Sequence, residues 1–294
     1  MRAAVLGGLA GCTSIFGLDS PQRGRDAALI DTDTMDDAAP DGPLEPWGSI
    51  TQVIVSSFPD DDPSLTDDML ELYFDRGSEI AIAKRSSVLD PWGPPTIVAE
   101  LMSPGADGRP QVSGDGLLMI FSSNRAPSMG LDLWWTVRGS RADVWQPPMQ
   151  FTLINSAADE IAGPQTENTL EIVYAAARIA NNSVDLYFAD RPPGSSAVFN
   201  QGVSLAFNTT DTETSPFLTR DGQHLYFTRS GPSTMMADLY VSHRLSATQW
   251  SPPEPIIELN TAAGDSDPWV SPDERYMFFA RHVGGVFKIH EATR

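Results

Sequence analysis

The sequence predicts an all-β fold: a five-bladed β-propeller of four-stranded blades over residues 46–294, closed by an N-terminal strand that completes the C-terminal blade. Three observations predict it: an internal repeat, a high content of turn-forming residues, and an unpaired strand pattern at each end of the repeats. The 294 residues include 23 glycines and 24 prolines, which favours many turns and few long helices.

Five segments share a pattern of a proline, an Asp or Asn turn, an apolar strand that ends in an aromatic residue, and an arginine. Their prolines recur at spacings of 47, 54, 52 and 52 residues: Pro63, Pro110, Pro164, Pro216 and Pro268. Each unit continues with a third strand, such as Asp132–Trp134, and an aromatic-led fourth segment, such as Trp145–Pro148. Four short strands in a unit of this length are typical of propeller blades. A parallel β-helix is the competing fold, but its rungs are about half as long.

The two ends of the repeat region complement each other. The fifth unit stops after its third strand, near Phe287–Ala292, whereas Pro46–Val55 precedes the first unit and has the pattern of a fourth strand. We therefore expect residues 47–55 to pair with residues 286–291, which would close the ring and protect its open edges.

The repeat resembles a known family. Ser271–Arg281 reads Ser-Pro-Asp-Glu-Arg-Tyr-Met-Phe-Phe-Ala-Arg and resembles the WD40-like PD40 repeat of TolB-type propellers, and the likeness extends over all five units. TolB has six blades and an extra N-terminal α/β domain, which this length does not accommodate. The resemblance therefore implies the repeat family, and the TolB-like context implies a sensory or assembly role beside peptidoglycan-binding lipoproteins.

The N-terminus indicates a cell-envelope protein. Leu9-Ala10-Gly11-Cys12 resembles the lipobox of bacterial lipoproteins, which implies a signal peptide over residues 1–11 and a lipid on Cys12. Thr13 follows the cysteine in place of the Asp that retains lipoproteins in the inner membrane, so the resemblance implies an outer-membrane location. Residues 12–45 are predicted to be the lipidated N-terminus and a disordered acidic tether, because eight acids and two arginines fall between Asp19 and Glu45.

Composition excludes several classes of protein. Acids outnumber bases 39 to 19, and the net charge of -20 argues against a nucleic-acid partner. The single cysteine excludes disulfides and Cys-rich metal sites, and no apolar run is long enough for a transmembrane helix. Hydrolase and phosphate-loop motifs are absent, and the four histidines fall at unrelated blade positions. We expect no cofactor and no metal site.

Charged residues recur at equivalent positions of the blades. An acid precedes each repeated proline: Asp60, Asp107, Glu160, Glu213 and Asp265. An arginine ends each second strand: Arg76, Arg125, Arg178, Arg229 and Arg281. A further acid opens three of the third strands: Asp132, Asp185 and Asp238. We interpret them as structural ion pairs in which each arginine clamps the carboxylates of its own blade. The alternative is a charged ring that binds a peptide or a polyol at the mouth of the central channel.

Other residues belong to one blade only. Trp269, Arg109 and Asp267 lie beside the repeated prolines and differ from their counterparts in the other blades, so they are the candidate ligand-binding rim, with Trp269 as the stacking residue. In contrast, the aromatic residues that lead the fourth segments recur, so they are predicted to pack at blade edges: Trp92, Trp145, Phe199 and Trp250.

We expect a non-enzymatic binding or scaffold lipoprotein that recognises a protein or a cell-wall or glycan ligand on the propeller rim. The alternative is a glycoside-acting hydrolase or lyase, because some five-bladed propellers cleave glycosides with carboxylates at the channel mouth. An arginine beside each rim acid would lower the pKa of that carboxyl, which is the opposite of what a general acid requires. An enzyme should instead place two carboxylates without arginine partners in the central cleft.

Overall fold

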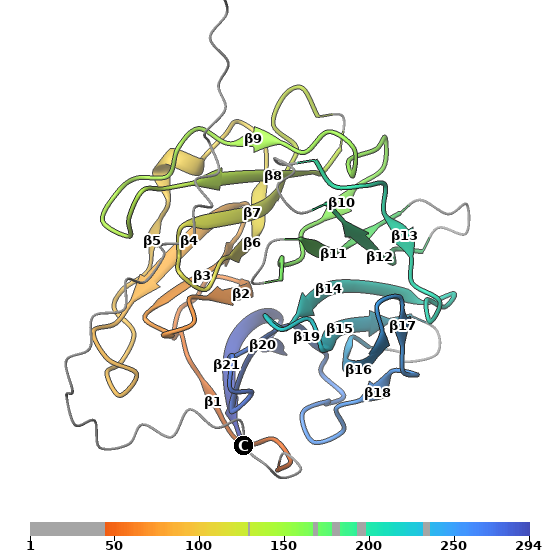
Figure 1. Cartoon of the computed structure of the whole chain (residues 1–294). Helices are drawn as coiled ribbons and strands as arrows, with labels where there is room; N and C mark the ends of the chain where they lie inside the picture. The colour runs from red at the N-terminus through yellow and green to blue at the C-terminus, as the bar shows by residue number, and fades with distance from the viewer. Residues whose placement is uncertain (1–44, 129, 167–169, 178–182, 193–197, 232–235) are drawn as a thin grey trace, which may run out of the picture. The chain divides into compact units, whose positions relative to one another are not determined.

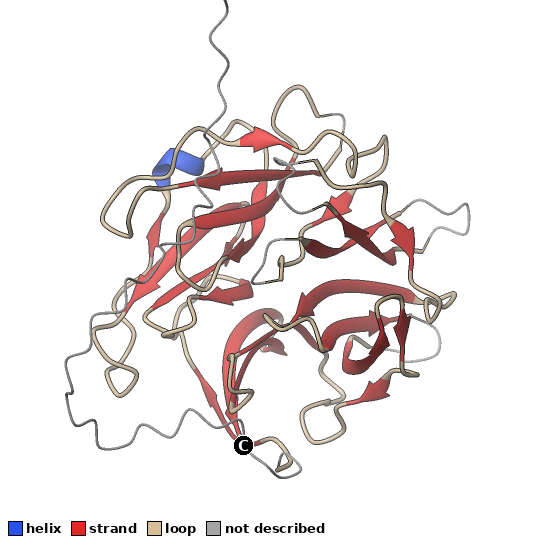
Figure 2. Cartoon of the chain, in the orientation of Figure 1, coloured by secondary structure: helices blue, strands red, loops and turns tan. Residues whose placement is uncertain are grey.

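A computed structural model describes residues 45–128, 130–166, 170–177, 183–192, 198–231 and 236–294. Five antiparallel sheets surround a common centre and form a five-bladed β-propeller (Figure 1). Strands account for nearly all of its regular structure (Figure 2), and the described ranges contain a single short 3₁₀ turn, Ala99–Leu101. None of the helical structure in these ranges has the length and apolar character needed to cross a membrane. The predicted fold class is therefore confirmed.

The blades follow one another along the chain, and each begins with its innermost strand. Blade 1 contains β2 (Asp60–Leu65), β3 (Glu71–Arg76), β4 (Glu79–Lys84) and β5 (Thr96–Ile97). Blade 2 contains β6 (Asp107–Val112), β7 (Leu118–Ser123), β8 (Asp132–Val137) and β9 (Met149–Gln150). Blade 3 contains β10 (Glu160–Ile161), β11 (Glu171–Ala176), β12 (Asp185–Asp190) and β13 (Val203–Ser204). Blade 4 contains β14 (Thr212–Leu218), β15 (His224–Ser230), β16 (Asp238–Ser246), β17 (Gln249–Trp250) and β18 (Glu254–Pro255).

Blade 5 is built from both ends of the described chain. It contains β19 (Asp265–Val270), β20 (Tyr276–Val283) and β21 (Val286–Thr293), and its outermost strand is β1 (Gly48–Gln52). β1 pairs antiparallel with β21 and places Thr51 opposite Glu291. The Val53 amide then donates to the Ile289 carbonyl at 2.9 Å. The predicted closure by the N-terminal strand is confirmed.

The repeated prolines occupy irregularities of the innermost strands. The register with the second strand shifts across each proline of blades 1, 2, 4 and 5. The residue before each of these prolines has a positive φ between 48° and 56°: Asp62, Arg109, Ser215 and Asp267. Proline has no amide hydrogen to donate to a sheet, so a bulge is where an inner strand can hold it. The bulge explains why the repeat depends on proline.

A second set of arginines, which the sequence analysis did not single out, fastens the outer edge of every blade. Each lies near the end of a third strand and stacks on the aromatic residue that leads the fourth. The guanidinium-to-ring distances are 4.3, 4.4, 4.8, 5.4 and 4.0 Å for Arg85 on Trp92, Arg138 on Trp145, Arg191 on Phe199, Arg244 on Trp250 and Arg294 on Trp47. The predicted edge packing of the aromatic residues is confirmed, and Trp47 repeats it across the ring closure.

Trp47 is expected to stabilise the closed ring. Its side chain is buried, belongs to the core cluster of blade 5 and lies under the Arg294 guanidinium. Replacing Trp47→Ala should lower the free energy of unfolding by about 3–5 kcal/mol, because it removes a buried aromatic side chain. Chemical denaturation measures this change. Val55→Ala, in a side chain that is 89% exposed, is the control, and equal stability of the two variants would contradict the role of Trp47.

Candidate functional site

The repeated acids and arginines form ion pairs within their own blades. Nitrogen-to-oxygen distances are 2.8, 2.6, 2.8 and 2.6 Å in Arg76–Asp60, Arg125–Asp107, Arg229–Glu213 and Arg281–Asp265. In each pair the carboxylate is buried and the guanidinium lies over a phenylalanine of its own strand. The predicted clamps of these four blades are present. Arg178, the expected partner of Glu160, lies outside the described residues.

The clamp carboxylates also hold the loop that enters each blade. The amides of Ser103, Thr209 and Thr261 donate to Asp107, Glu213 and Asp265 at 2.7, 3.1 and 2.6 Å. Arg281 and Arg125 donate in turn to loop carbonyl groups, for example Arg281 Nη2 to Leu259 O at 2.7 Å. Such carboxylates have few lone pairs left for a ligand. This geometry supports a structural role for the clamps.

The third acidic set does not join these clamps as expected. Within the described residues, Asp132 and Asp238 form no ion pair with an arginine; Asp132 instead accepts from Gln150 Nε2 at 2.5 Å. Burial and the nearby Asp265 raise the pKa of Asp238. Asp185 accepts from Ser183 at 3.1 Å, and its expected partner Arg178 is again outside the described ranges. The predicted ion pairs of Asp132 and Asp238 with the clamp arginines were wrong. Arg125 and Arg229 pair instead with acids of the inner strands, Asp107 and Glu213.

The interpretation of Trp269 as a stacking surface was wrong. Its side chain is 1% exposed and packs against Phe217 and Phe278 at ring distances of 6.0 and 5.7 Å. The bulge at Pro268 shifts the alternation of the inner strand, so the residue after the proline turns into the space between blades 4 and 5. Trp269 is therefore a core residue.

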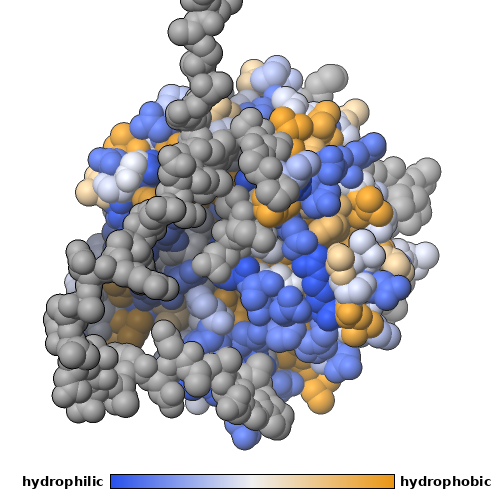
Figure 3. All heavy atoms as spheres, viewed as in Figure 1, coloured by the Kyte–Doolittle hydropathy of each residue, from blue (hydrophilic) through white to orange (hydrophobic). Residues whose placement is uncertain are grey.

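The residues before the prolines do meet. Asp62, Arg109 and Asp267 lie on the innermost strands of blades 1, 2 and 5, and their charges interact. Asp61 and Asp75 of blade 1 belong to the same group, and Asp75 Oδ1 accepts from the Arg109 amide at 2.6 Å. We call these five residues the axial acidic site. On the described part of the face in Figure 3, hydrophilic residues gather around the middle of the ring.

Arg109 and Asp267, two of the three residues predicted for the ligand-binding rim, thus lie together with blade 1 residues on the innermost strands. Asp61 and Asp75 were not among the candidate residues predicted from the sequence. The available signal was the run Asp60-Asp61-Asp62, which blade 1 alone carries before its proline. Asp75 also depends on Gly108 of blade 2, since a Cβ there would lie 2.3 Å from the Asp75 carboxylate. No sequence pattern within blade 1 could reveal that contact.

Burial raises the pKa of three carboxyls of the axial acidic site, those of Asp61, Asp62 and Asp75. Burial, followed by the charge of Asp267, raises the pKa of Asp61 to about 7. Burial also raises the pKa of Asp62 and Asp75 well above the usual range, and neighbouring aspartates add to the effect. The Arg109 guanidinium opposes these shifts without forming an ion pair to any of the four within the described residues. Four carboxyls and one guanidinium leave the site acidic.

The site could also hold a cation. One oxygen from each of Asp61, Asp62 and Asp75 lies within 4.8 Å of the others, and this is the one such group in the described ranges. Two oxygens on one Ca²⁺ are separated by at most about 5 Å, and hard cations prefer carboxylate oxygen. The expectation of no metal site rested on the single cysteine and the scattered histidines and did not consider carboxylate clusters. Two of the histidines, His224 and His243, do lie face to edge at 4.8 Å.

Known proteins that are similar to this chain share its fold but differ in function. No family model matches the sequence, and no curated protein matches it. The structure is similar to that of a putative TolB from Agrobacterium tumefaciens (TM-score 0.53, 16% identity, covering 81% of this chain and 78% of that chain).

Two sugar-cleaving proteins are similar as well. They are an endo-arabinase from Bacteroides thetaiotaomicron (TM-score 0.61, 11% identity, 83% of this chain and 96% of that chain) and the catalytic domain of a GH62 α-L-arabinofuranosidase from Coprinopsis cinerea (TM-score 0.60, 11% identity, 84% and 96%). At these identities the likeness shows the propeller fold that this chain shares with TolB-like proteins and with glycoside hydrolases.

The clamp geometry predicts that lysine cannot replace the arginine. Arg229 Nε donates to Glu213 at 2.8 Å while the guanidinium lies 4.8 Å from the Tyr240 ring centre. Arg229→Lys keeps the charge but loses the planar donor and the stacking, so the free energy of unfolding should fall by about 1–2 kcal/mol. Urea titration tests this. The control is Arg275→Lys on an exposed turn, and an unchanged midpoint for Arg229→Lys would refute the clamp.

The axial carboxyls predict an unusual pH dependence of stability. Because the folded pKa of Asp61 lies above the unfolded value of about 3.9, the folded state binds the proton more tightly. Its contribution is fully present below about pH 4 and is lost as the pH rises through about 7. Asp61→Asn should therefore be more stable than the parent chain at about pH 8, with a smaller difference at about pH 4.

Thermal unfolding at the two pH values measures this difference. Asp90→Asn is the matched control, because it makes the same charge change at an exposed position. A gain in stability for Asp61→Asn that is the same at both pH values would contradict the raised pKa.

Proposed function

We propose that this chain is a non-enzymatic binding module of the bacterial cell envelope, outer-membrane anchored through a lipid on Cys12, whose protein partner places a basic group in the axial acidic site. The observation that carries the proposal is the Asp62 carboxyl. It is 8% exposed, and among the described residues it has no hydrogen-bond donor and no ion-pair partner. Its neighbours Asp61, Asp75 and Asp267 are carboxyls as well, and their ionised forms repel a negative charge on Asp62.

A buried carboxylate without a partner is costly, so it takes up a proton or acquires a counter-charge. A lysine, an arginine or an amino terminus of a partner supplies that charge and releases the protons. Binding should therefore strengthen as the pH rises from about 5 to about 8, and weaken with salt. The clamp carboxylates are poorer candidates, since Asp107, Glu213 and Asp265 each already have an arginine and a loop amide.

A defined basic peptide tests the proposal. Trilysine amide should bind the parent chain more tightly at about pH 8 than at about pH 5, as measured by isothermal titration calorimetry. Asp62→Asn should weaken binding by about tenfold or more, because it removes one buried charge partner. Asp90→Asn makes the same change in net charge on the surface and should leave the affinity nearly unchanged. Equal affinities for the two variants would show that only general surface charge is at work.

Glycoside hydrolysis is the second candidate for two reasons. The centre of the ring holds carboxyls without an arginine ion pair among the described residues, as expected of an enzyme, and a carboxyl with a pKa of about 7 suits a general acid. Against an inverting enzyme, the oxygens of Asp61, Asp62 and Asp75 lie within 4.8 Å of one another, closer than the roughly 6.5–9.5 Å between its carboxyls. A retaining enzyme, with carboxyls roughly 5–5.5 Å apart, needs an ionised nucleophile, whereas burial raises the pKa of both Asp62 and Asp75. Release of 4-nitrophenol from its α-L-arabinofuranoside, or of sugar from linear arabinan, decides the matter. We expect neither. Release that is abolished by Asp61→Asn would favour the hydrolase.

A further inference from the structure

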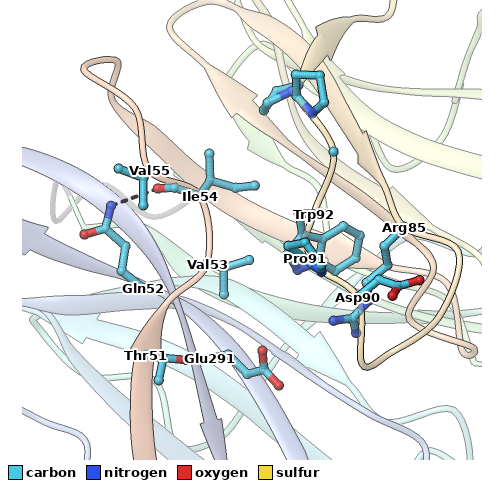
Figure 4. A pocket seen from close by; sticks show the side chains of 13 residues that line it. Thr51, Gln52, Val53, Ile54, Val55, Arg85, Asp90, Pro91, Trp92 and Glu291 are labelled. Atoms are coloured by element: carbon cyan, nitrogen blue, oxygen red, sulfur yellow. Dashed lines mark hydrogen bonds between the residues drawn. The ribbon is translucent and has the colours of Figure 1, made fainter.

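A pocket of about 440 Å³ opens where blade 5 meets blade 1 (Figure 4). One side is formed by Thr51–Val55 of β1 and the segment after it. The other side is formed by Arg85 and the loop that contains Asp90–Pro95, with Glu291 of β21 at one end. This volume lies in the range of small-molecule sites, about 300–1,000 Å³. We call it the closing-seam pocket, and it shares no residue with the axial acidic site.

Comparison of the blades explains why a pocket forms here. Glu291 lies opposite Phe278 on the second strand of its blade, and the other four blades have an apolar residue at the equivalent position: Ile82, Trp135, Phe188 and Val241. Ile82 packs against the cluster that contains Trp145 of the next blade, and Phe188 lies under Arg244 of the next blade. Glu291 thus places a carboxyl at a position where the other four blades have an apolar side chain.

The Glu291 carboxyl is half buried and unpaired. Burial raises its pKa, and the charge of Arg85 opposes this. Within the described residues, no group donates a hydrogen bond to the carboxyl and no ion pair joins it to Arg85. Arg85 is held elsewhere: Nε and Nη1 donate to the Met69 and Val88 carbonyls at 2.8 and 3.0 Å, and the guanidinium stacks on Trp92. A polar ligand between them would satisfy both groups.

The walls of the pocket do not suit an extended peptide. A peptide that adds to a sheet edge needs free main-chain groups. On one wall Gln52 Nε2 already donates to the Ile54 carbonyl at 2.8 Å, as the dashed line in Figure 4 shows. On the other wall Pro91, Pro94 and Pro95 have no amide hydrogen to offer. Recognition here must depend on side chains.

We propose that the closing-seam pocket binds a saccharide unit. The apolar C–H face of a sugar ring would pack on the prolines beside Trp92, whose ring already contacts Arg85 and Phe278. The sugar hydroxyls would donate to Glu291 and accept from Arg85. A neutral polyol also suits the charge of the pocket. Arg85 already interacts with Asp90 and Glu291, so the carboxylate of an amino acid would add a third negative charge beside it. The proposal is independent of the axial acidic site.

Calorimetry and saturation-transfer NMR of the full chain with cellobiose, xylobiose and N,N′-diacetylchitobiose test the proposal. At least one of these disaccharides should bind in the millimolar range or tighter. Glu291→Leu installs the kind of residue that the other blades have, so it should fold with an equal or higher melting temperature and weaken binding by about tenfold or more. Glu291→Gln keeps the shape and the acceptor oxygen, and should weaken binding less.

Glu254→Gln, which makes the same change at an exposed position of blade 4, is the matched control and should leave disaccharide affinity unchanged. The proposal is overturned if none of the three disaccharides binds, or if folded Glu291→Leu and Glu291→Gln both bind as the parent chain does. It is also overturned if alanylalanine binds the pocket and the disaccharides do not.

Discussion

The antiparallel pairing of β1 with β21 is the contact on which the rest of the structure depends. It joins residues separated by most of the chain: Lys288 Nζ donates to the carbonyls of Ser56 and Phe58 at 2.7 and 2.5 Å, across 232 and 230 positions. Bringing such distant segments together costs conformational entropy. Main-chain hydrogen bonds, the burial of Trp47 and its contact with Arg294 offset that cost. Both candidate sites exist only after this contact has formed.

Two sets of arginines maintain a common frame around the ring. One set, exemplified by Arg229, ties the inner strand to the loop that enters the blade, and the other, exemplified by Arg138, ties the third strand to the fourth. Both use the planar guanidinium, which can pair and stack at the same time. Within the described residues, nine of the chain's 17 arginines belong to these two sets, whereas only Lys84 and Lys288 are lysine. Because repeated residues stabilise every blade in the same way, the positions that differ between blades are free to bind a ligand.

The two sites use such positions in different ways. The axial acidic site gathers residues from blades 1, 2 and 5 at the centre, where burial and like charge weaken the acids. The closing-seam pocket arises from one departure, Glu291, at a position that is apolar elsewhere. In both places a buried carboxyl lacks a partner within the described chain. Unsatisfied buried groups of this kind are destabilising, and the clamp carboxylates of the same ring are paired with arginines. The two unpaired carboxyls are therefore the places where a ligand would gain most.

Sequence alone determined the blade, the ring closure and the four described clamps. These features depend on short patterns that recur at a fixed spacing, so each copy supports the interpretation of the others. Trp269 shows the limit of that reasoning. The bulge at Pro268 shifts the alternation of side chains by one residue, so Trp269 points into the core and not toward the axis. The alternation of residue types in the sequence does not reveal a shift of one residue. Only the tertiary structure decided that Asp61 and Asp75 join Arg109, and that Glu291 faces Arg85, because these residues meet across blades whose relative positions are set by the closed ring.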